Sequence, residues 1–587
     1  MRRINILLAS IAAAGLAVSC TDKLDVENPN QQTTDAFGKS ASDLKESVIA
    51  AYNHTRMEGS YARVGYTIDV CRGDEVWNSS QVWYLPFDNL NVQSSVDISE
   101  WPWREWYYTI NVTNYILSKV DGIGLAQDEL NQIKGQALFL RGLSYYNLAV
   151  YYQDVPLITD YSDYATLDGL YKANSTQDEV LNQVESDFKT AMSILPSRSA
   201  GGEWAKGRAT CGAAAGFYAK TLMFRHKFAE ANSVLKDIIG GKYGSYRLMP
   251  DFGDNFREGS AYENNDESLY EVQYLDYGSQ GTDDEWTPVN TSSNATQGHA
   301  VESNFGPGVL GGWADLSASP WLYNLFKSEL TTDGQLDPRL YWTIGTYEAE
   351  YDSYKDGRQN VMYMQPIPAE GFVTNNNNGG IPVVKHTAAR ENLYDAVVTG
   401  LHCGVNIRLL RYADILLLAA ECENEVNGPN QTAIGYINQV RNRAGLKSLD
   451  LANFGDKDKL FEQIANVERP KELGCEYGRG VDLIRWGFFY RQDRLDQLKA
   501  HGSYEKSKTL VTTSPDFTTA TAPTVEDRGT FDSSYNYYIE GHEYIPVPQA
   551  NLNANPNLRG NSANESRSNA SVYSAHGYNI HPVVDLN

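Results

Sequence analysis

The chain has 587 residues, of which 42% are hydrophobic, and it carries a formal net charge of −25 at neutral pH. This composition excludes a disordered protein, because a chain of this length and hydrophobic content can bury one large core or two smaller ones. The acidic charge repels nucleic acid, and no basic patch with interleaved aromatic residues opposes it, so we expect no nucleic-acid partner.

The N-terminus has the parts of a signal peptide. Arg2 and Arg3 precede an apolar run over residues 6–18. This run is shorter than the roughly 20 residues that span a bilayer. The segment Leu16-Ala17-Val18-Ser19-Cys20 resembles the lipobox of bacterial lipoproteins, which implies removal of residues 1–19 and acylation of Cys20. An ordinary secretory signal with an incidental Cys is the alternative.

A polar and acidic stretch follows the predicted lipidation site. Residues 20–35 suit a flexible tether between lipid and fold. Loss of residues 1–19 removes two Arg and no acidic residue, so the mature chain carries a charge of −27. Several acyl chains make a stable anchor, at about 0.8 kcal/mol for each buried methylene. Acidic residues directly after the Cys resemble the surface-export signal of Bacteroidetes lipoproteins, so we expect a lipid-anchored outer-membrane protein that faces the extracellular medium.

Hydrophobic spacing predicts several amphipathic helices in the first half of the chain. Residues 131–152 place apolar or small side chains at intervals of three and four along one face. Thr176-Gln177-Asp178-Glu179 has the form of a capping box and opens a helix that Pro196 ends. Residues 210–239 predict two helices joined near His226 and Lys227, the first rich in Ala and Gly.

A further helix pair is predicted in the second half. It runs from about Arg411 to Asn427, breaks at Gly428-Pro429, and continues from Thr432 to Ala444 before Gly445. Helix pairs of this length resemble tetratricopeptide units, without the full consensus of that repeat. Between the helical regions, residues 251–310, 352–380 and 503–536 are dense in Gly, Asn, Ser, Asp and aromatics, and they predict long ordered loops that carry binding residues.

The remaining cysteines and charged residues favour structural roles. Five Cys beyond Cys20 lack CxxC spacing, so we expect buried free thiols and neither a zinc site nor a disulfide framework. Charged residues on the second-half helices must be paired to be buried, so we expect scaffold ion pairs. These residues are Arg411, Asp414, Glu421, Arg441, Glu468, Arg469, Asp482 and Arg485. No HExxH, GxSxG or P-loop motif is present, and we expect no enzyme, no metal and no cofactor.

A series of ordered motifs resembles the SusD/RagB family of nutrient-uptake outer-membrane lipoproteins. The motifs are RGDEVW at 72–77, GQALFLRG at 135–142, DVPLI at 154–158, LRYADILLLAAE at 410–421, INQVRNRAGL at 437–446, DLIRWG at 482–487 and YIPVP at 544–548. The resemblance implies a mostly α fold, with tetratricopeptide-like helix pairs in a right-handed superhelical scaffold and long loop-rich insertions. It implies one structural unit made of an N-terminal region, 36–250, and a C-terminal region, 251–587.

Two features depart from the family's pattern. Pro470 directly follows Glu468-Arg469, where the family usually continues a helix, so we expect a kink or a late helix start. A Ser/Asn-rich tail over residues 562–587 extends beyond the family's usual end and has no assigned role.

The resemblance also implies a partner and a ligand class. The partner is a SusC-like TonB-dependent transporter, and the ligand is an oligosaccharide. Sugar binding needs flat apolar faces and planar polar groups, which aromatic and amide side chains supply. The candidate ligand-binding residues are Trp83, Trp313, Trp77, Tyr84, Trp286, Asp74 and Asn78, with Trp83 and Trp313 as the leading platform. Core packing is the expectation for Trp103, Trp106, Trp342 and Trp486.

Three functions remain open from the sequence. The leading interpretation is a non-catalytic binding protein that captures oligosaccharides and delivers them to the transporter. A helical-repeat scaffold of the transporter complex, binding peptides or other nutrients, is the second. A surface glycoside hydrolase is the third, because acidic residues such as Asp283, Asp284 and Glu285 supply carboxylates.

Overall fold

A computed structural model of the chain describes residues 38–78, 81–275, 298–306, 312–313, 315–344, 381–385, 387, 403–502, 508–511, 524–527, 534–559, 573 and 576–586. Among these residues no helix is both long and apolar enough to span a bilayer. The predicted signal peptide and Cys20, Trp286, and the loop at 352–380 lie outside the described residues.

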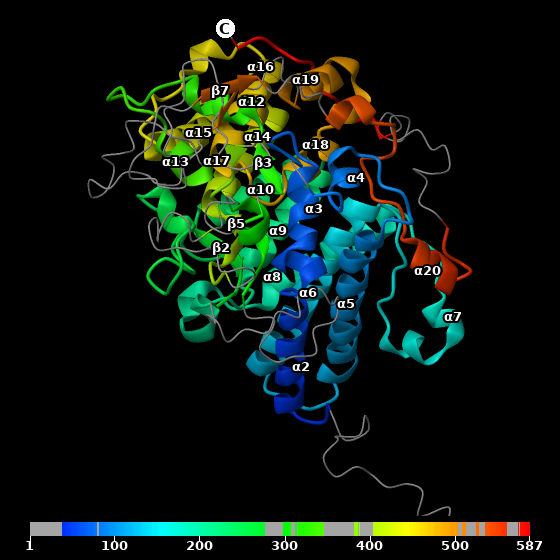
Figure 1. Cartoon of the computed structure of the whole chain (residues 1–587). Helices are drawn as coiled ribbons and strands as arrows, with labels where there is room; N and C mark the ends of the chain where they lie inside the picture. The colour runs from blue at the N-terminus through cyan, green and yellow to red at the C-terminus, as the bar shows by residue number, and fades with distance from the viewer. Residues whose placement is uncertain are drawn as a thin grey trace, which may run out of the picture.

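Helices dominate the first half of the molecule, and the prediction of a mostly α fold is confirmed. The helices up to residue 239 are α2 Ala41–His54, α3 Val64–Cys71, α4 Leu85–Asp88, α5 Glu100–Val120, α6 Gln127–Tyr152, α7 Leu167–Leu170, α8 Gln177–Ile194, α9 Cys211–Phe224 and α10 Phe228–Ile239. In Figure 1, α2, α5 and α6 lie side by side in the lower part of the molecule.

The second half is also helical, with shorter elements. Its helices are α11 Val301–Phe305, α12 Pro320–Lys327, α13 Pro338–Thr343, α14 Tyr412–Asn427, α15 Gln431–Arg443, α16 Lys457–Gln463, α17 Arg469–Leu473, α18 Arg479–Arg485, α19 Gln492–Gly502 and α20 Gln549–Ala554. Figure 1 places most of them above the N-terminal helices, while α20 lies beside α7 at the edge of the molecule. Asn555, just after α20, donates its side-chain amide to the carbonyl of Lys172, after α7.

Among the described residues, seven short strands form small antiparallel sheets that the sequence patterns did not predict. The strands are β1 Val76–Asn78, β2 Ser268–Val272, β3 Leu316–Ala318, β4 Ile381–Pro382, β5 Ile407–Arg411, β6 Lys508–Val511 and β7 Thr524–Asp527. They pair as β1-β3-β4, β2-β5 and β6-β7. In the first sheet Trp77 lies opposite Ser317, so segments from both halves of the chain meet there.

Local signals placed the long helices correctly. Thr176 and Glu179 form both bonds of the predicted capping box at the start of α8. Asn430 caps α15, and its side-chain oxygen accepts from the backbone N–H groups of Thr432 and Ala433. Before Pro470, residues 464–468 form a π-helical turn, and the chain stays helical from α16 through this turn into α17 at Arg469, so there is no late helix start.

Helix α6 is buried more completely than its sequence pattern suggests. The pattern predicts one apolar face, whereas every residue from 135 to 152 is buried. The helix packs between α5 and α8, so two of its faces are buried rather than one. Its charged residue Arg141 is tolerated there because the guanidinium makes two 2.8 Å hydrogen bonds to Asp187 of α8.

The helices pack in chain order around a shared core. Contacts run from α8 to α9, α9 to α10, α10 to α14 and α14 to α15. Gly216 permits one close approach, because a Cβ atom there would lie 2.3 Å from Leu410 Cδ2 of β5. One hydrophobic cluster includes residues from Ala51 to Val547, and a smaller one lies between α2, α5 and α6. The tetratricopeptide type of these pairs and the superhelical hand stay predictions.

Candidate functional site

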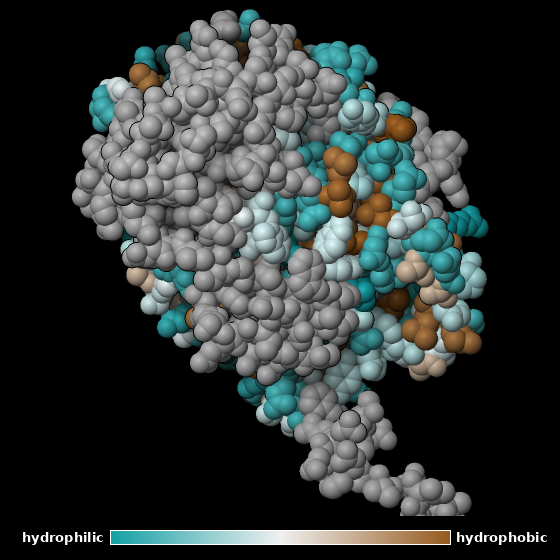
Figure 2. All heavy atoms as spheres, in the orientation of Figure 1, coloured by the Kyte–Doolittle hydropathy of each residue, from teal (hydrophilic) through white to brown (hydrophobic). Residues whose placement is uncertain are grey.

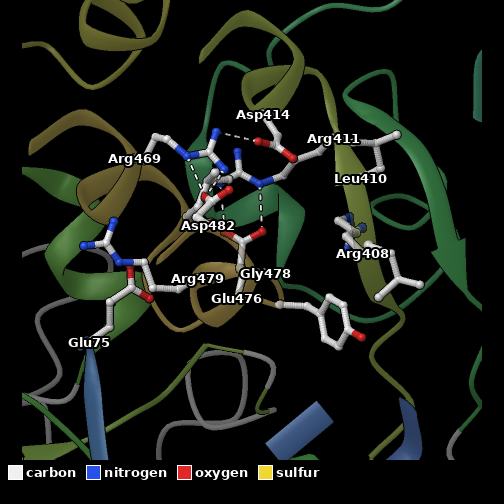
Figure 3. Close-up of a pocket in the computed structure, with 13 residues that line it drawn as sticks. Glu75, Arg408, Leu410, Arg411, Asp414, Arg469, Glu476, Gly478, Arg479 and Asp482 are labelled. Carbon is white, nitrogen blue, oxygen red and sulfur yellow. Dashed lines mark hydrogen bonds and ion pairs between the residues drawn. The ribbon is translucent and has the colours of Figure 1, made fainter. Parts of the chain in front are cut away.

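A buried network of charged residues lies where β5 meets α14 and the segment after α17 (Figure 3). Arg411, the last residue of β5, bonds Glu476 at 3.0 and 2.8 Å and Glu267 at 2.8 Å, and it also pairs with Glu472. The cavity among these side chains has a volume of about 20 Å³. It holds little more than one water molecule, so the network is no ligand site.

The neighbouring acidic and basic groups are paired in the same way. Arg469 bonds Asp414 at 2.8 Å and Asp482 at 2.6 Å. Arg485 bonds Asp482 at 2.7 Å and pairs with Glu421. The pKa of Asp414 is lowered because the charges of Lys220 and Arg469 outweigh the effect of burial, which would raise it. The predicted role of these residues as scaffold ion pairs is confirmed.

Asp74 is part of this scaffold rather than of an open surface. Its carboxylate accepts from Arg479 at 2.6 and 2.9 Å and bonds His501 Nδ1 at 2.7 Å. Burial alone would raise the pKa of Asp74, but the charge of Arg479 outweighs it and holds the pKa below its usual range. Trp321 stacks on His501 with ring centroids 3.8 Å apart. The prediction that Asp74 contacts a ligand is disfavoured by this burial.

The turn between β1 and α4 presents an aromatic ring to solvent. Asn78 shapes the turn, because its side chain accepts from the backbone N–H of Gln81 at 2.9 Å and donates to the Gln81 carbonyl at 2.5 Å. Trp83 is 36% exposed, and its ring meets Trp101 edge to face at 6.4 Å. Trp101 is itself buried, so it supports Trp83 from below.

Tyr84 anchors this turn instead of lining a surface. Its side chain is buried, and its hydroxyl accepts from Asn304 Nδ2 at 3.2 Å. The same amide donates to Thr67 Oγ1 of α3 at 2.7 Å. Asn304 therefore ties α11 to α3 and to the turn that carries Trp83. The sequence predicted Tyr84 as a ligand contact, whereas its hydroxyl accepts a hydrogen bond in the protein interior.

Trp313 is held against the same anchor. Its backbone N–H donates to the carbonyl of Ser303, the residue before Asn304, at 2.6 Å. Its half-buried ring lies 5.8 Å from the guanidinium carbon of Arg63, a cation–π arrangement. Trp83 and Trp313 are thus both attached, through Tyr84 and Ser303, to the end of α11. The structure brings these two predicted residues into one region.

A buried charged cluster lies beneath this region. Arg63 donates to Glu58 at 2.7 Å, and Glu105 of α5 lies buried nearby. Burial raises the pKa of Glu58 to about 7 despite the opposing charge of Arg63. Burial and the charge of Glu58 also raise the pKa of Glu105 well above its usual value. Arg63 was not predicted as a residue of this region, because only its contact with Trp313 in the folded chain places it there.

Exposed apolar side chains surround Trp83. Val82 is 71% exposed and Leu85 is 44% exposed. Figure 2 shows apolar side chains gathered on the face that carries α3 and α4 in Figure 1. The sequence signal for these residues is the apolar run from Val82 to Leu85 before Pro86, from which the prediction took only the aromatic members. Trp77 of β1, which precedes these residues in the sequence, is half-buried.

The remaining tryptophans behave as core residues. Trp103, Trp106, Trp342 and Trp486 are all buried, as predicted. The five described cysteines, Cys71, Cys211, Cys403, Cys422 and Cys475, are buried free thiols, which is also as predicted. Within the part of the chain that the structure describes, no group of three or more His, Cys, Asp or Glu side chains is placed to hold a metal ion.

Comparison with known proteins identifies the family. The sequence profile of the SusD family matches residues 266–563. The chain belongs to the SusD family. A second SusD-like profile, described as starch-binding and associating with the outer membrane, matches residues 22–223. SusD-like proteins P25 and P38 of Formosa agariphila are 24% and 25% identical to the chain, cover 80% and 82% of it, and are themselves covered to 87% and 91%.

Solved SusD-like structures share the fold. A SusD superfamily protein of Bacteroides vulgatus superposes with a TM-score of 0.68 at 22% identity, over 90% of this chain and all of its own. Surface glycan-binding protein A of Bacteroides thetaiotaomicron, solved in complex with laminarihexaose, superposes with a TM-score of 0.64 at 20% identity, over 89% of this chain and 99% of its own. The SusD family name thus describes both the sequence and the architecture of this chain.

Proposed function

We propose that this SusD-family chain is a non-catalytic lipoprotein of the outer-membrane surface that captures oligosaccharides and delivers them to a TonB-dependent transporter. The observation that carries the binding role is the shared anchoring of Trp83 and Trp313 to the end of α11. Two indole rings on backbone segments that hydrogen bonds fix to α11 supply flat apolar faces at low entropic cost, as sugar rings require. The laminarihexaose complex of a structural relative supports the ligand class.

The catalytic alternative has less support from the described carboxylates. The buried acids of the second-half helices are engaged by Arg side chains, as Asp74 is by Arg479. A glycosidase needs two carboxyl groups on either side of an accessible sugar bond. The scaffold alternative predicts that the chain does not bind polysaccharides, and the hydrolase alternative predicts that it cleaves them. One polysaccharide assay therefore separates the three functions.

The test is electrophoresis of the purified chain in gels that contain laminarin or other neutral polysaccharides. We expect retardation of the wild type, with Trp83→Ala and Trp313→Ala each weakening binding by about 2 kcal/mol, on the order of 30-fold. The control is Tyr436→Ala, which removes a half-buried aromatic side chain from α15, a helix well separated from α4 in Figure 1; it should bind as wild type does.

The outcomes differ for each function. Undiminished retardation of both Trp variants would reject this surface as the site. Absence of retardation by every polysaccharide, with a stable complex still formed with a barrel transporter, would favour the scaffold. Release of reducing ends from the polysaccharide would show a hydrolase. Co-purification of the lipidated chain with a TonB-dependent transporter tests the delivery step.

A further inference from the structure

A second cavity lies where the end of α6, the start of α8 and the C-terminal tail meet. Its volume is about 410 Å³, within the range of small-molecule pockets, roughly 300–1,000 Å³. Four tyrosines line it, together with Gln177 and Arg225. They are Tyr490, Tyr544, Tyr573 and Tyr578. None of the cavity's lining residues belongs to the surface around Trp83 and Trp313.

The tail supplies one wall of this cavity. The SusD profile ends at residue 563, so Tyr573, His576 and Tyr578 lie beyond the matched region. The tail is nevertheless packed on the scaffold, because Arg494 of α19 donates to the carbonyls of His581 and Pro582 at 2.8 and 2.7 Å. The described part of the predicted Ser/Asn-rich tail is therefore packed on the scaffold and forms one wall of a cavity.

The aromatic wall is held rigidly. Tyr578 stacks on His226 with ring centroids 3.8 Å apart and an angle of 9° between the rings, and its hydroxyl donates to the carbonyl of Arg225 at 3.2 Å. Tyr573 donates its hydroxyl to the carbonyl of Arg485 at 2.7 Å and lies 3.0 Å from His226 Nε2. Preorganised aromatic faces of this kind bind a ligand without a further loss of side-chain entropy.

The two arginines in the wall are paired with acidic side chains. Arg225 bonds Glu185 at 2.7 Å and Asp178 at 3.4 Å. Arg485 pairs with Glu421 and Asp482. A charged ligand would have to compete with these ion pairs, and a neutral one would not. The lining therefore favours a neutral ligand with apolar ring faces and hydroxyl groups.

Polar groups at the start of α8 complete the lining. Gln177 donates its side-chain amide to the carbonyl of Ala149 at 2.8 Å and to the Tyr544 hydroxyl at 3.4 Å. Asp154 accepts from the backbone N–H of Gln177 at 2.9 Å. Gln153, which lines the cavity, has a positive φ angle of 64°. His226, which stacks behind Tyr578, has a φ angle of 54°. Such strained backbone concentrates at ligand sites.

We propose that this cavity is a second binding site that takes one or two units of a neutral saccharide. The tyrosine faces and the amide and carboxylate groups of the α8 start match the two kinds of surface that a pyranose presents. The ligand class rests on the proposed function, while the site uses different residues. The site lets the chain hold a short saccharide independently of the Trp83 and Trp313 surface.

The experiment is saturation-transfer difference NMR on the mature chain with laminaribiose, maltose, cellobiose and N-acetylglucosamine, and with glucuronic acid as the anionic comparison. The measurement is made on the double variant Trp83→Ala, Trp313→Ala, which lacks both rings of the first proposed site, so that signals report on the second cavity. We expect transfer to at least one neutral saccharide and roughly tenfold weaker binding when Tyr578→Ala is added. Gln177→Ala should also weaken it, while Tyr436→Ala should not.

Two results would overturn the proposal. The first is an absence of transfer from the double variant Trp83→Ala, Trp313→Ala to all four neutral saccharides, and the second is transfer that both Tyr578→Ala and Gln177→Ala leave unchanged. Transfer to glucuronic acid alone would reject the neutral class. Retardation in polysaccharide gels is measured on the same variants. If only the second site is lost, Tyr578→Ala is still retarded in these gels. If the wild type itself is not retarded, the proposed function is rejected instead.

Discussion

His299 shows how burial changes the charge of a single side chain. Its ring is buried beside the bridge to Cys403, and Nε2 lies 2.9 Å from the carbonyl of Val405. Burial lowers the pKa of His299 from 6.5 to about 3, more than this bond raises it. The folded chain therefore keeps the ring neutral at a pH where an unfolded chain protonates it.

This shift predicts an acid dependence of stability. Between pH 6.5 and pH 3 the unfolded state binds the additional proton, so the stability linked to His299 is present above pH 6.5 and is lost as the pH falls. We expect the wild type to lose about 1.4 kcal/mol per pH unit through this group, and His299→Gln to lack that loss. Urea unfolding at pH 7.5 and pH 5.5 measures the difference. Equal losses in the two proteins would contradict it.

At the scale of elements, the π-helical turn Glu58–Ala62 packs directly on the start of α5. A Cβ atom at Gly59 would lie 2.4 Å from the backbone carbon of Trp101. The backbone there cannot move aside as a flexible side chain can. Because Trp101 lies under Trp83, the glycine sets the position of the proposed sugar platform as well as the packing of α5.

Substitution of this glycine should therefore destabilise the chain. We expect Gly59→Ala to cost about 1–3 kcal/mol in the free energy of unfolding and to weaken polysaccharide retention. Gly435→Ala in α15 is the matched control, since no atom lies within 4 Å of its Cβ position, and it should stabilise the helix by about 0.5–1 kcal/mol. Chemical denaturation tests both, and a Gly59→Ala chain as stable as wild type would contradict the packing argument.

Arg411 joins three elements through its charge. It ends β5, and its guanidinium bonds Glu267 before β2 and Glu476 after α17. We expect Arg411→Met to cost about 3–5 kcal/mol, because buried carboxylates would lose their partner. Arg247→Met, which breaks the 2.7 Å pair with Asp266 at a side chain that is 74% exposed, should cost at most about 1 kcal/mol. Urea unfolding compares them, and similar losses would contradict the role of burial.

At the scale of the whole molecule, the proposed role requires an anchor outside the fold. We expect Cys20→Ala to lose incorporation of a fatty-acid label and to leave the membrane fraction, because acylation of Cys20 supplies the anchor. Thr21→Ala, next to the predicted lipidation site, is the control and should keep the label. A fatty-acid label that persists in Cys20→Ala would reject the lipoprotein assignment.

Features that depend on neighbours a few residues apart were predictable. The capping box at Thr176 and the break after Asn427 involve local bonds and local sterics. Burial of Trp103 and Trp486 was also predicted. These signals, with the ordered motifs, predict the helical fold.

The short strands and the composition of the site needed the folded chain. Asp74 pairs with Arg479 across 405 positions of sequence, and Tyr84 bonds Asn304 across 220. No periodicity links residues so far apart. Both side chains carry groups that could bind a sugar. Both point into the protein, where they are the hydrogen-bond partners of a buried Arg and a buried amide that would otherwise be unsatisfied.

The sequence alone predicted a lipoprotein signal, determined the positions of the main helices and singled out Trp83 and Trp313 as aromatic candidates. Only the tertiary structure decided that the segments carrying these two rings are both bonded to α11, that Asp74 and Tyr84 are buried, and that the tail forms one wall of a cavity. The physical reason is range: helix propensity and capping act over about four residues, whereas burial and ion pairing depend on which distant segments the core brings together.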